Sequence, residues 1–74
     1  MRDAAKTTDA LKINSVREHR KAARLTQAEL GKICGVSRQS IVSVEGGDYA
    51  PSVYLAIKLA KALGTTVETL FETE

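Results

Sequence analysis

Glycine and proline divide this chain into short segments, and that spacing limits its fold more than any other feature of the sequence. Both residue types interrupt regular secondary structure, and beyond residue 30 the longest segment between two of them is 52–63. No stretch alternates with the period of a β-strand over more than a few residues. We therefore predict an all-α fold of five short helices. The interrupting residues are Gly31, Gly35, Gly46, Gly47, Pro51 and Gly64.

The chain before the first glycine holds an arm and one complete helix. Residues 1–13 are small and polar without a helical period, so we interpret them as a flexible N-terminal arm. The remaining residues, 14–74, are predicted to form one domain. Its first helix is expected at about residues 15–23, with Asn14 or Ser15 as the N-terminal cap.

The second helix begins with a stronger signal. Thr26-Gln-Ala-Glu29 matches a capping box, in which the Thr hydroxyl and the Glu carboxylate each accept a hydrogen bond from a free backbone N–H. Leu30, Ile33 and Cys34 follow with the i, i+3, i+4 spacing of one apolar helix face. Gly35 stands where a residue of positive φ ends a helix.

The third helix, predicted at Arg38–Glu45 with Ser37 as its cap, has two distinct faces. At 100° per residue, Ile41 and Val44 share one side. A second arc of about 140° carries a cation, an amide, a hydroxyl and one valine. These four residues are Arg38, Gln39, Val42 and Ser43.

Two further helices complete the prediction. Pro51-Ser52 opens the fourth and Gly64 closes it. We expect its apolar face to comprise Val53, Ala56, Ile57, Ala60 and Leu63, and its solvent stripe to comprise Tyr54, Lys58 and Lys61. The fifth helix is short, is capped by Thr66 and carries Val67, Leu70 and Phe71.

Composition excludes several classes of protein. A single cysteine, Cys34, cannot form an internal disulfide or a multi-cysteine zinc site. No apolar run approaches the roughly 20 residues of a membrane helix, and residues 1–9 lack the apolar segment of a signal peptide, so we expect a cytoplasmic protein with no membrane partner. A single domain in a chain of 74 residues is marginally stable alone, which makes a dimer expected.

Charge is unevenly distributed along the chain. Residues 12–38 hold seven cations and two carboxylates, whereas residues 39–74 hold two cations and five carboxylates. This distribution predicts one surface that faces a polyanion and another that avoids it. The alternative is random clustering of charges in a short chain.

The second and third helices, joined at Gly35, have the spacing of a helix-turn-helix. Gly31 is small where the two helices approach each other. A generic pair of packed helices would not require the polar arc, whose residue types are those that contact bases. The expected inward residues are Leu30, Ile33, Cys34, Val36, Ile41 and Val44.

Taken together, several segments resemble the Cro/CI-like (xenobiotic-response-element) helix-turn-helix regulators, in particular short single-domain members from bacteria and phages. The resemblance covers about residues 12–72. It implies a lambda-repressor-like DNA-binding domain that takes double-stranded DNA as its partner and needs no cofactor or metal. The segments that carry it are 25–30, 35–41, 45–47, 49–52, 60–64 and 70–71.

By position, the resemblance implies that residues 38–45 form the recognition helix in the major groove. Arg38 can pair with guanine, Gln39 with the adenine edge, and Val42 can pack on a thymine methyl group. Ser43 is the fourth implied base contact. Implied phosphate contacts are Gln27 and Ser37, while the rim cations Lys21, Arg24 and Lys32 serve either as phosphate contacts or as solubilising charges.

Arg20 and Glu45 match a partly buried ion pair found in some members of the family, although a solvated charge is the alternative for Arg20. Three positions depart from the family pattern. His19 stands where an aliphatic residue is common, Arg24 stands where glycine is common, and Gly46 replaces the usual asparagine.

These features predict a sequence-specific transcriptional regulator, a repressor that binds a pseudo-palindromic operator as a homodimer. Val67, Leu70 and Phe71 are candidates for the dimer surface, and the alternative for each is the intramolecular core. A competing function is an antitoxin or protein-interaction module with the same fold and a toxin as partner. An enzyme is not expected, because the sequence shows neither a metal-ligand cluster nor a phosphate-binding glycine loop.

Overall fold

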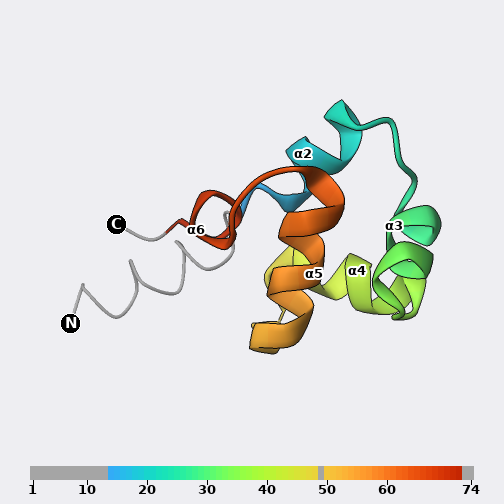
Figure 1. The fold of residues 1–74 in the computed structure, drawn as a ribbon. Coiled ribbons are helices and arrows are strands. Elements are labelled where there is room, and N and C mark those ends of the chain that lie inside the picture. The colour runs from blue at the N-terminus through green and yellow to red at the C-terminus, as the bar shows by residue number, and fades with distance from the viewer. Residues whose placement is uncertain (1–13, 49, 73–74) are drawn as a thin grey trace.

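Five α-helices follow one another in the part of the chain that the structure, a computed structural model, describes: residues 14–48 and 50–72. Figure 1 shows their arrangement. The prediction of an all-α fold is confirmed, whereas the arm predicted at residues 1–13 lies outside the described residues. The helices are α2 (Val16–Ala22), α3 (Gln27–Cys34), α4 (Arg38–Gly46), α5 (Val53–Leu63) and α6 (Val67–Leu70).

Local capping chemistry sets most of the helix ends. At the start of α3, Thr26 Oγ1 accepts from the Glu29 N–H at 3.0 Å, and Glu29 Oε1 accepts from the Thr26 N–H at 2.8 Å, which completes the capping box. Ser37, Ser52 and Thr66 cap α4, α5 and α6 in the same way, each with its side-chain oxygen. Helices α3, α4 and α5 end at glycines with φ near +70°, namely Gly35, Gly47 and Gly64.

The segment before α2 is fixed to two distant helices. Asn14 Oδ1 accepts from the Val16 N–H at 3.1 Å, while its Nδ2 donates to the Val44 carbonyl at 2.8 Å. Ser15 donates from its N–H to the Leu70 carbonyl at 2.9 Å. Ser15 is thus the N-cap residue of α2 without a side-chain cap bond, while Asn14 accepts from the first N–H of that helix and ties it to the end of α4.

One aliphatic core joins all five described helices. Side chains from α2, α3, α4, α5 and α6 meet there, and six of them are fully buried. Burial of this apolar surface is the main force that holds helices too short to be stable alone. The core consists of Val16, Leu30, Cys34, Ile41, Val44, Leu55, Leu59, Ala60 and Leu70.

The inward face predicted for α5 is wrong in part. Val53 is 72% exposed and Ile57 is 40% exposed, whereas Leu55 and Leu59 are buried. Since α5 is apolar on most of its circumference, periodicity alone could not select the buried side. Packing against α3 and α6 selects it instead.

The prediction that Ile33 faces inward is also wrong, because its side chain is 59% exposed. In α3 the inward direction is set by Leu30 and Cys34, which are both buried one turn apart. Ile33, the remaining apolar residue of the i, i+3, i+4 pattern, points outward.

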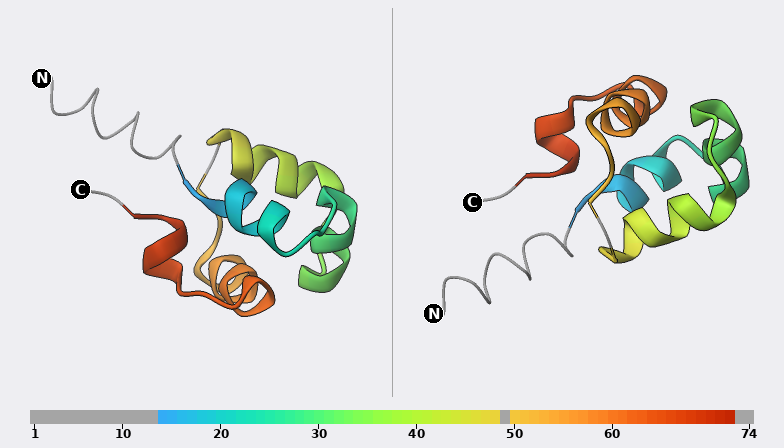
Figure 2. Two further views of the ribbon diagram at one scale, coloured as in Figure 1. Left: turned by 90° about the horizontal axis from the view of Figure 1, so that it is seen from above. Right: turned by 90° about the horizontal axis from the view of Figure 1, so that it is seen from below.

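Helices α3 and α4 pack at one end of the molecule, and α6 lies at the other (Figures 1 and 2). At the turn between α3 and α4, the Val36 N–H donates to the Gly31 carbonyl at 2.8 Å. No helix within residues 14–48 and 50–72 is long and apolar enough to cross a membrane.

Candidate nucleic-acid interface

Helix α4 presents a polar face to solvent and an apolar face to the core. Ile41 and Val44 are fully buried, which fixes the rotation of the helix about its axis. As a consequence Arg38 and Gln39 are exposed in the first turn, and Val42 and Ser43 are half-buried one turn later. All four predicted base-contact residues are thus on one accessible side of α4.

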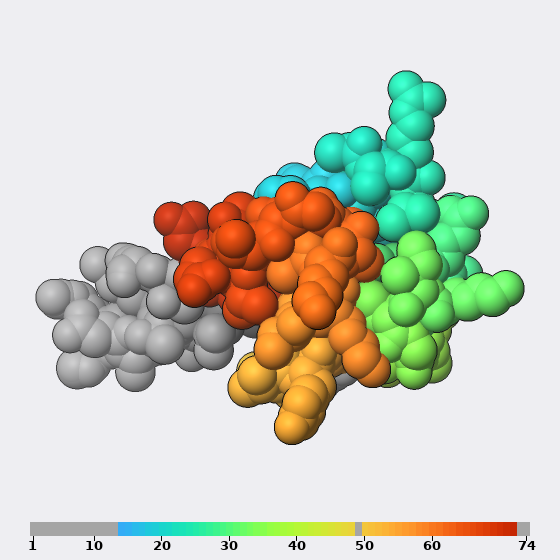
Figure 3. Space-filling view, in the orientation of Figure 1, coloured from blue at the N-terminus to red at the C-terminus, as the bar shows by residue number. Residues whose placement is uncertain are grey.

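The chemistry of that face suits the edges of base pairs. The Arg38 guanidinium offers a planar fork of donors, and the Gln39 amide offers a donor beside an acceptor. Gln39 Nε2 lies 3.5 Å from Ser43 Oγ, at the outer limit of a hydrogen bond, so the amide is only loosely held by its own helix. Figure 3 shows α3 and the beginning of α4 at the molecular surface at this end, with one side chain of α3 projecting from it.

The N-terminus of α3 carries the residue predicted as a phosphate contact, Gln27. Its side chain is half-buried, and Nε2 donates to Glu45 Oε1 at 3.1 Å. The capping box occupies the N–H groups of Thr26 and Glu29, whereas those of Gln27 and Ala28 have no partner within the helix. Such an N-terminus favours an anion through its N–H groups and its dipole.

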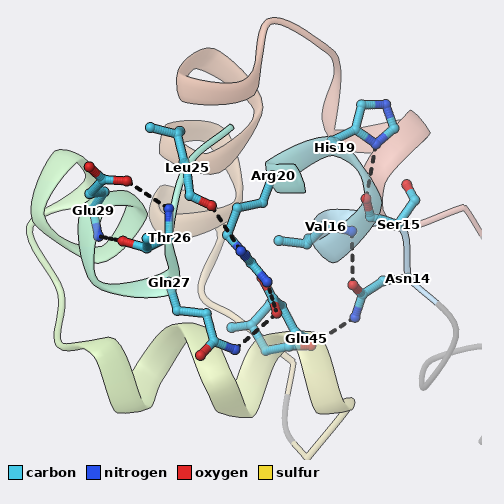
Figure 4. A network of polar contacts seen from close by, with 11 residues as sticks. Asn14, Ser15, Val16, His19, Arg20, Leu25, Thr26, Gln27, Glu29 and Glu45 are labelled. Atoms are coloured by element: carbon cyan, nitrogen blue, oxygen red, sulfur yellow. Dashed lines mark hydrogen bonds and ion pairs between the residues drawn. The ribbon is translucent and has the colours of Figure 1, made fainter. Parts of the chain in front are cut away.

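Arg20 and Glu45 form an ion pair between α2 and α4 (Figure 4). Arg20 Nε donates to Glu45 Oε2 at 2.6 Å, and Nη2 donates to Oε1 at 3.2 Å. A third donor, Nη1, reaches the Leu25 carbonyl at 2.8 Å. The side chains are 10% and 5% exposed, so this is a nearly buried pair rather than a solvated one.

The remaining predicted phosphate contacts are scattered on the surface. Lys21 and Arg24 are exposed at the end of α2, and Lys32 is exposed in the last turn of α3. Arg24 has φ +61°, the left-handed conformation that glycine adopts without cost. Ser37 is exposed, but its hydroxyl is used as the cap of α4 and accepts from the Ser40 N–H at 3.1 Å.

For Leu70, a dimer candidate with the intramolecular core as its alternative, the structure selects the core. Its side chain is fully buried in the intramolecular core. Val67 and Phe71 are half-buried and pack against that core. The large apolar side chains that are exposed on α5 are instead Val53, Tyr54 and Ile57.

The surroundings of Cys34 and His19 are those of structural residues. Burial raises the pKa of the Cys34 thiol, so the thiol is protonated and unreactive at neutral pH. His19 Nδ1 lies 2.9 Å from the Ser15 carbonyl oxygen within its own helix. The described residues include no group of three His, Cys, Asp or Glu side chains that could hold a metal ion.

Two contacts of this region were missing from the sequence predictions. One is the bond from Gln27 to Glu45, and the other is the bond from Asn14 to Val44. Each joins residues that are far apart in the chain, and no local pattern indicates them. Glu45 thereby connects α2, α3 and α4 through one carboxylate.

Comparison with known proteins gives consistent matches. A helix-turn-helix family model matches residues 16–70. An HTH-type transcriptional regulator of Methanothermobacter thermautotrophicus is 49% identical over 57 residues, which cover 76% of this chain and 83% of that protein.

Two solved structures are similar to the whole fold. The restriction-modification controller protein C.AhdI from Aeromonas hydrophila has a TM-score of 0.72 at 31% sequence identity, and the match covers 92% of this chain and 98% of that chain. The clp gene regulator ClgR from Corynebacterium glutamicum has a TM-score of 0.74 at 26% identity, and the match covers 86% of this chain and 67% of that chain.

Proposed function

This chain belongs to the Cro/CI-like helix-turn-helix family of transcriptional regulators, which are non-enzymatic DNA-binding proteins, and we propose that it is a repressor. In this proposal two copies bind a pseudo-palindromic operator in double-stranded DNA and act by occupying a promoter. The recognition helices α4 of the two copies would lie about 34–36 Å apart, one turn of the duplex.

The observation that carries this proposal is the division of α4 into two faces. Ile41 and Val44 are locked in the core, so the helix cannot rotate and its outer side chains are held for contact. Arg38 and Gln39 on that outer side are the residue types that pair with guanine and adenine in the major groove.

Phosphate contacts would place α4 in the groove. The N-terminus of α3, with Gln27 as its first residue, supplies neutral donors to one phosphate. The exposed cations Lys21, Arg24 and Lys32 supply charge to others, and they account for the salt dependence that we expect.

For the dimer we propose the exposed apolar part of α5. Val53 and Tyr54 are 72% and 80% exposed, and Ile57 lies one turn further along the helix. A cluster of exposed large apolar residues in a small domain is typical of an interaction surface. Val67 and Phe71 of α6, which are half-buried, remain separate candidates for a dimer contact.

The same α5 surface also favours the second candidate function, an antitoxin whose apolar patch binds a toxin. The two candidates differ in DNA binding, because a pure interaction module has no need for the polar outer face of α4. Selective, salt-dependent DNA binding by the purified chain separates them.

A gel-shift series with DNA from upstream of the protein's own gene tests the repressor proposal. We expect nanomolar binding at physiological salt that is selective over unrelated DNA and weakens steeply as salt is raised. Weak, unselective binding that hardly changes with salt would contradict the proposal.

A further inference from the structure

Glu45 has a role that its place in an ion pair does not reveal. Resting on the proposed function, we propose that Glu45 positions the Gln27 amide for a DNA phosphate. In this arrangement Gln27 touches the DNA, and Glu45 is a positioning residue that acts through it.

The geometry at the carboxylate supports this role (Figure 4). Glu45 Oε1 accepts from Gln27 Nε2 at 3.1 Å and from Arg20 Nη2 at 3.2 Å. Its other oxygen accepts from Arg20 Nε at 2.6 Å. With a side chain only 5% exposed, the carboxylate is held on both oxygens and gives Gln27 a fixed acceptor.

A fixed acceptor restricts how the glutamine amide can turn. The Nε2 group carries two hydrogens, and Glu45 takes one of them. The second hydrogen remains for an oxygen outside the protein, on a side chain that is half-buried at the first position of α3. An anchored side chain has already lost the rotamer freedom that a free glutamine would lose on binding, which we expect to be worth about threefold to tenfold in affinity.

The charge balance permits a carboxylate at this place. A lone carboxylate close to a phosphate would repel it, but here Arg20 neutralises Glu45. Arg20 is itself held by the Leu25 carbonyl, which accepts from Nη1 at 2.8 Å. The ion pair therefore offers Gln27 an anchor without presenting net negative charge to the DNA.

A thermodynamic cycle tests the proposal. The first arm is Gln27→Ala in the wild-type protein, and the second is the same change in the double variant Arg20→Met/Glu45→Met. Replacing both members of a buried pair with apolar residues of similar size usually preserves the fold, which a cooperative thermal melt verifies. Dissociation constants are measured for a short duplex of arbitrary sequence at low salt.

We expect Gln27→Ala and the Arg20→Met/Glu45→Met variant each to weaken binding by about threefold to tenfold. Adding Gln27→Ala to the double variant should then weaken binding clearly less than it does in the wild-type protein, because an unanchored glutamine pays the rotamer cost on binding. If the double variant binds as tightly as wild type, or if Gln27→Ala has the same effect in both backgrounds, Glu45 does not act through Gln27.

Lys21→Ala provides the matched control. Lys21 is an exposed cation with a proposed phosphate contact, so its loss should weaken binding equally in both backgrounds and lower the slope of log K against log salt by about 0.9. Gln27→Ala should leave that slope unchanged because the amide carries no charge. An equal drop in the salt slope for Lys21→Ala and Gln27→Ala would contradict the assignment of Gln27 as an uncharged phosphate contact.

A second measurement does not depend on the variants. In the free wild-type protein, the Gln27 side-chain amide should be as rigid as the backbone, with a nitrogen-15 order parameter of about 0.85. A value below about 0.6, that of a flexible group, would overturn the proposal.

The experiments distinguish failure of the positioning role of Glu45 from failure of the proposed DNA-binding function. A wild-type protein that binds no duplex even at low salt overturns both. Tight binding combined with additive effects in the cycle overturns the positioning role alone.

Discussion

Gly31 is the residue at which the turn into α4 comes closest to α3. A Cβ atom at this position would lie 2.8 Å from the Val36 carbonyl oxygen and 3.2 Å from that of Ser37. Both contacts are with backbone, which cannot move without shifting α4. The requirement for glycine is therefore one of space, since Gly31 lies inside a helix.

We predict that Gly31→Ala lowers the free energy of unfolding by about 1 kcal/mol. Overpacking costs roughly 1–3 kcal/mol, and it outweighs the gain of about 1 kcal/mol from the better helix former. Gly46→Ala is the control, because a Cβ there meets only the Asp48 carboxylate at 3.5 Å, an ordinary contact. Urea denaturation curves measure both variants, and equal stabilities would contradict this account of the turn.

Arg24 is the one described residue other than glycine with positive φ. A side chain in the left-handed region costs roughly 1–2 kcal/mol, and the position is one at which the resemblance implied glycine. A strained residue at a functional surface suggests that the side chain contributes something other than stability. A contact with a DNA phosphate would be such a contribution.

We predict that Arg24→Gly has opposite effects on folding and on binding. Stability should rise by about 1 kcal/mol as the strain is removed, while DNA affinity falls and the salt slope decreases by about 0.9. Thermal melts and anisotropy titrations measure the two effects, with Arg24→Lys as the variant that keeps the charge. Unchanged affinity would show that Arg24 does not contact DNA.

At the scale of elements, the helix ends could be predicted and the helix rotations only in part. Ends depend on local groups, such as the Thr26 and Glu29 capping box and the glycine at 35, and these are visible in the sequence. The family was also recognisable from such segments and is confirmed. The rotation of a helix about its own axis depends on the helices that pack against it, so Ile33 was assigned to the wrong side of α3.

The candidate site also has one part that could be predicted from the sequence and one part that could not. The outer face of α4 followed from the spacing of Ile41 and Val44, which the core then fixed. The bond between Gln27 and Glu45 could not be predicted, because it depends on side-chain rotamers across an 18-residue separation. Interactions of this kind are decided only when α3 and α4 have packed.

The ion pair between α2 and α4 gives a prediction at the element scale. Glu45→Ala should lower the free energy of unfolding by roughly 3–5 kcal/mol, since it leaves the buried Arg20 without a partner. Replacing both residues with methionine should cost far less. Circular dichroism during urea denaturation measures the two variants, and a loss below half the expected range would place Arg20 effectively at the surface.

At the scale of the whole molecule, the two ends of the domain differ in character. Helices α3 and α4 occupy one end, and α6, which contains Glu68, occupies the other (Figure 1). The chain is basic over residues 12–38 and acidic over 39–74. This uneven charge supports the proposal that one face of the domain meets DNA and another avoids it, with the apolar part of α5 as the proposed dimer surface.

We predict that Tyr54→Glu dissociates the dimer without unfolding the chain. Tyr54 is 80% exposed, so the change should alter monomer stability by less than about 0.5 kcal/mol. Lys61→Gln, on the same side of α5 but nearer its end, is the control. Sedimentation equilibrium at micromolar concentration distinguishes the states, and a wild-type monomer, or a variant that still dimerises, would contradict the proposed surface.

Selection of bound fragments from a random DNA pool tests most directly whether the outer face of α4 determines sequence preference. The wild-type protein should enrich an inverted repeat whose half-site centres are about 10–10.5 base pairs apart. Arg38→Ala should lose preference at one position of each half-site and about 1–3 kcal/mol of binding, whereas Gln27→Ala should bind more weakly with the same motif. Absence of an enriched motif, or the same change in both variants, would contradict the account.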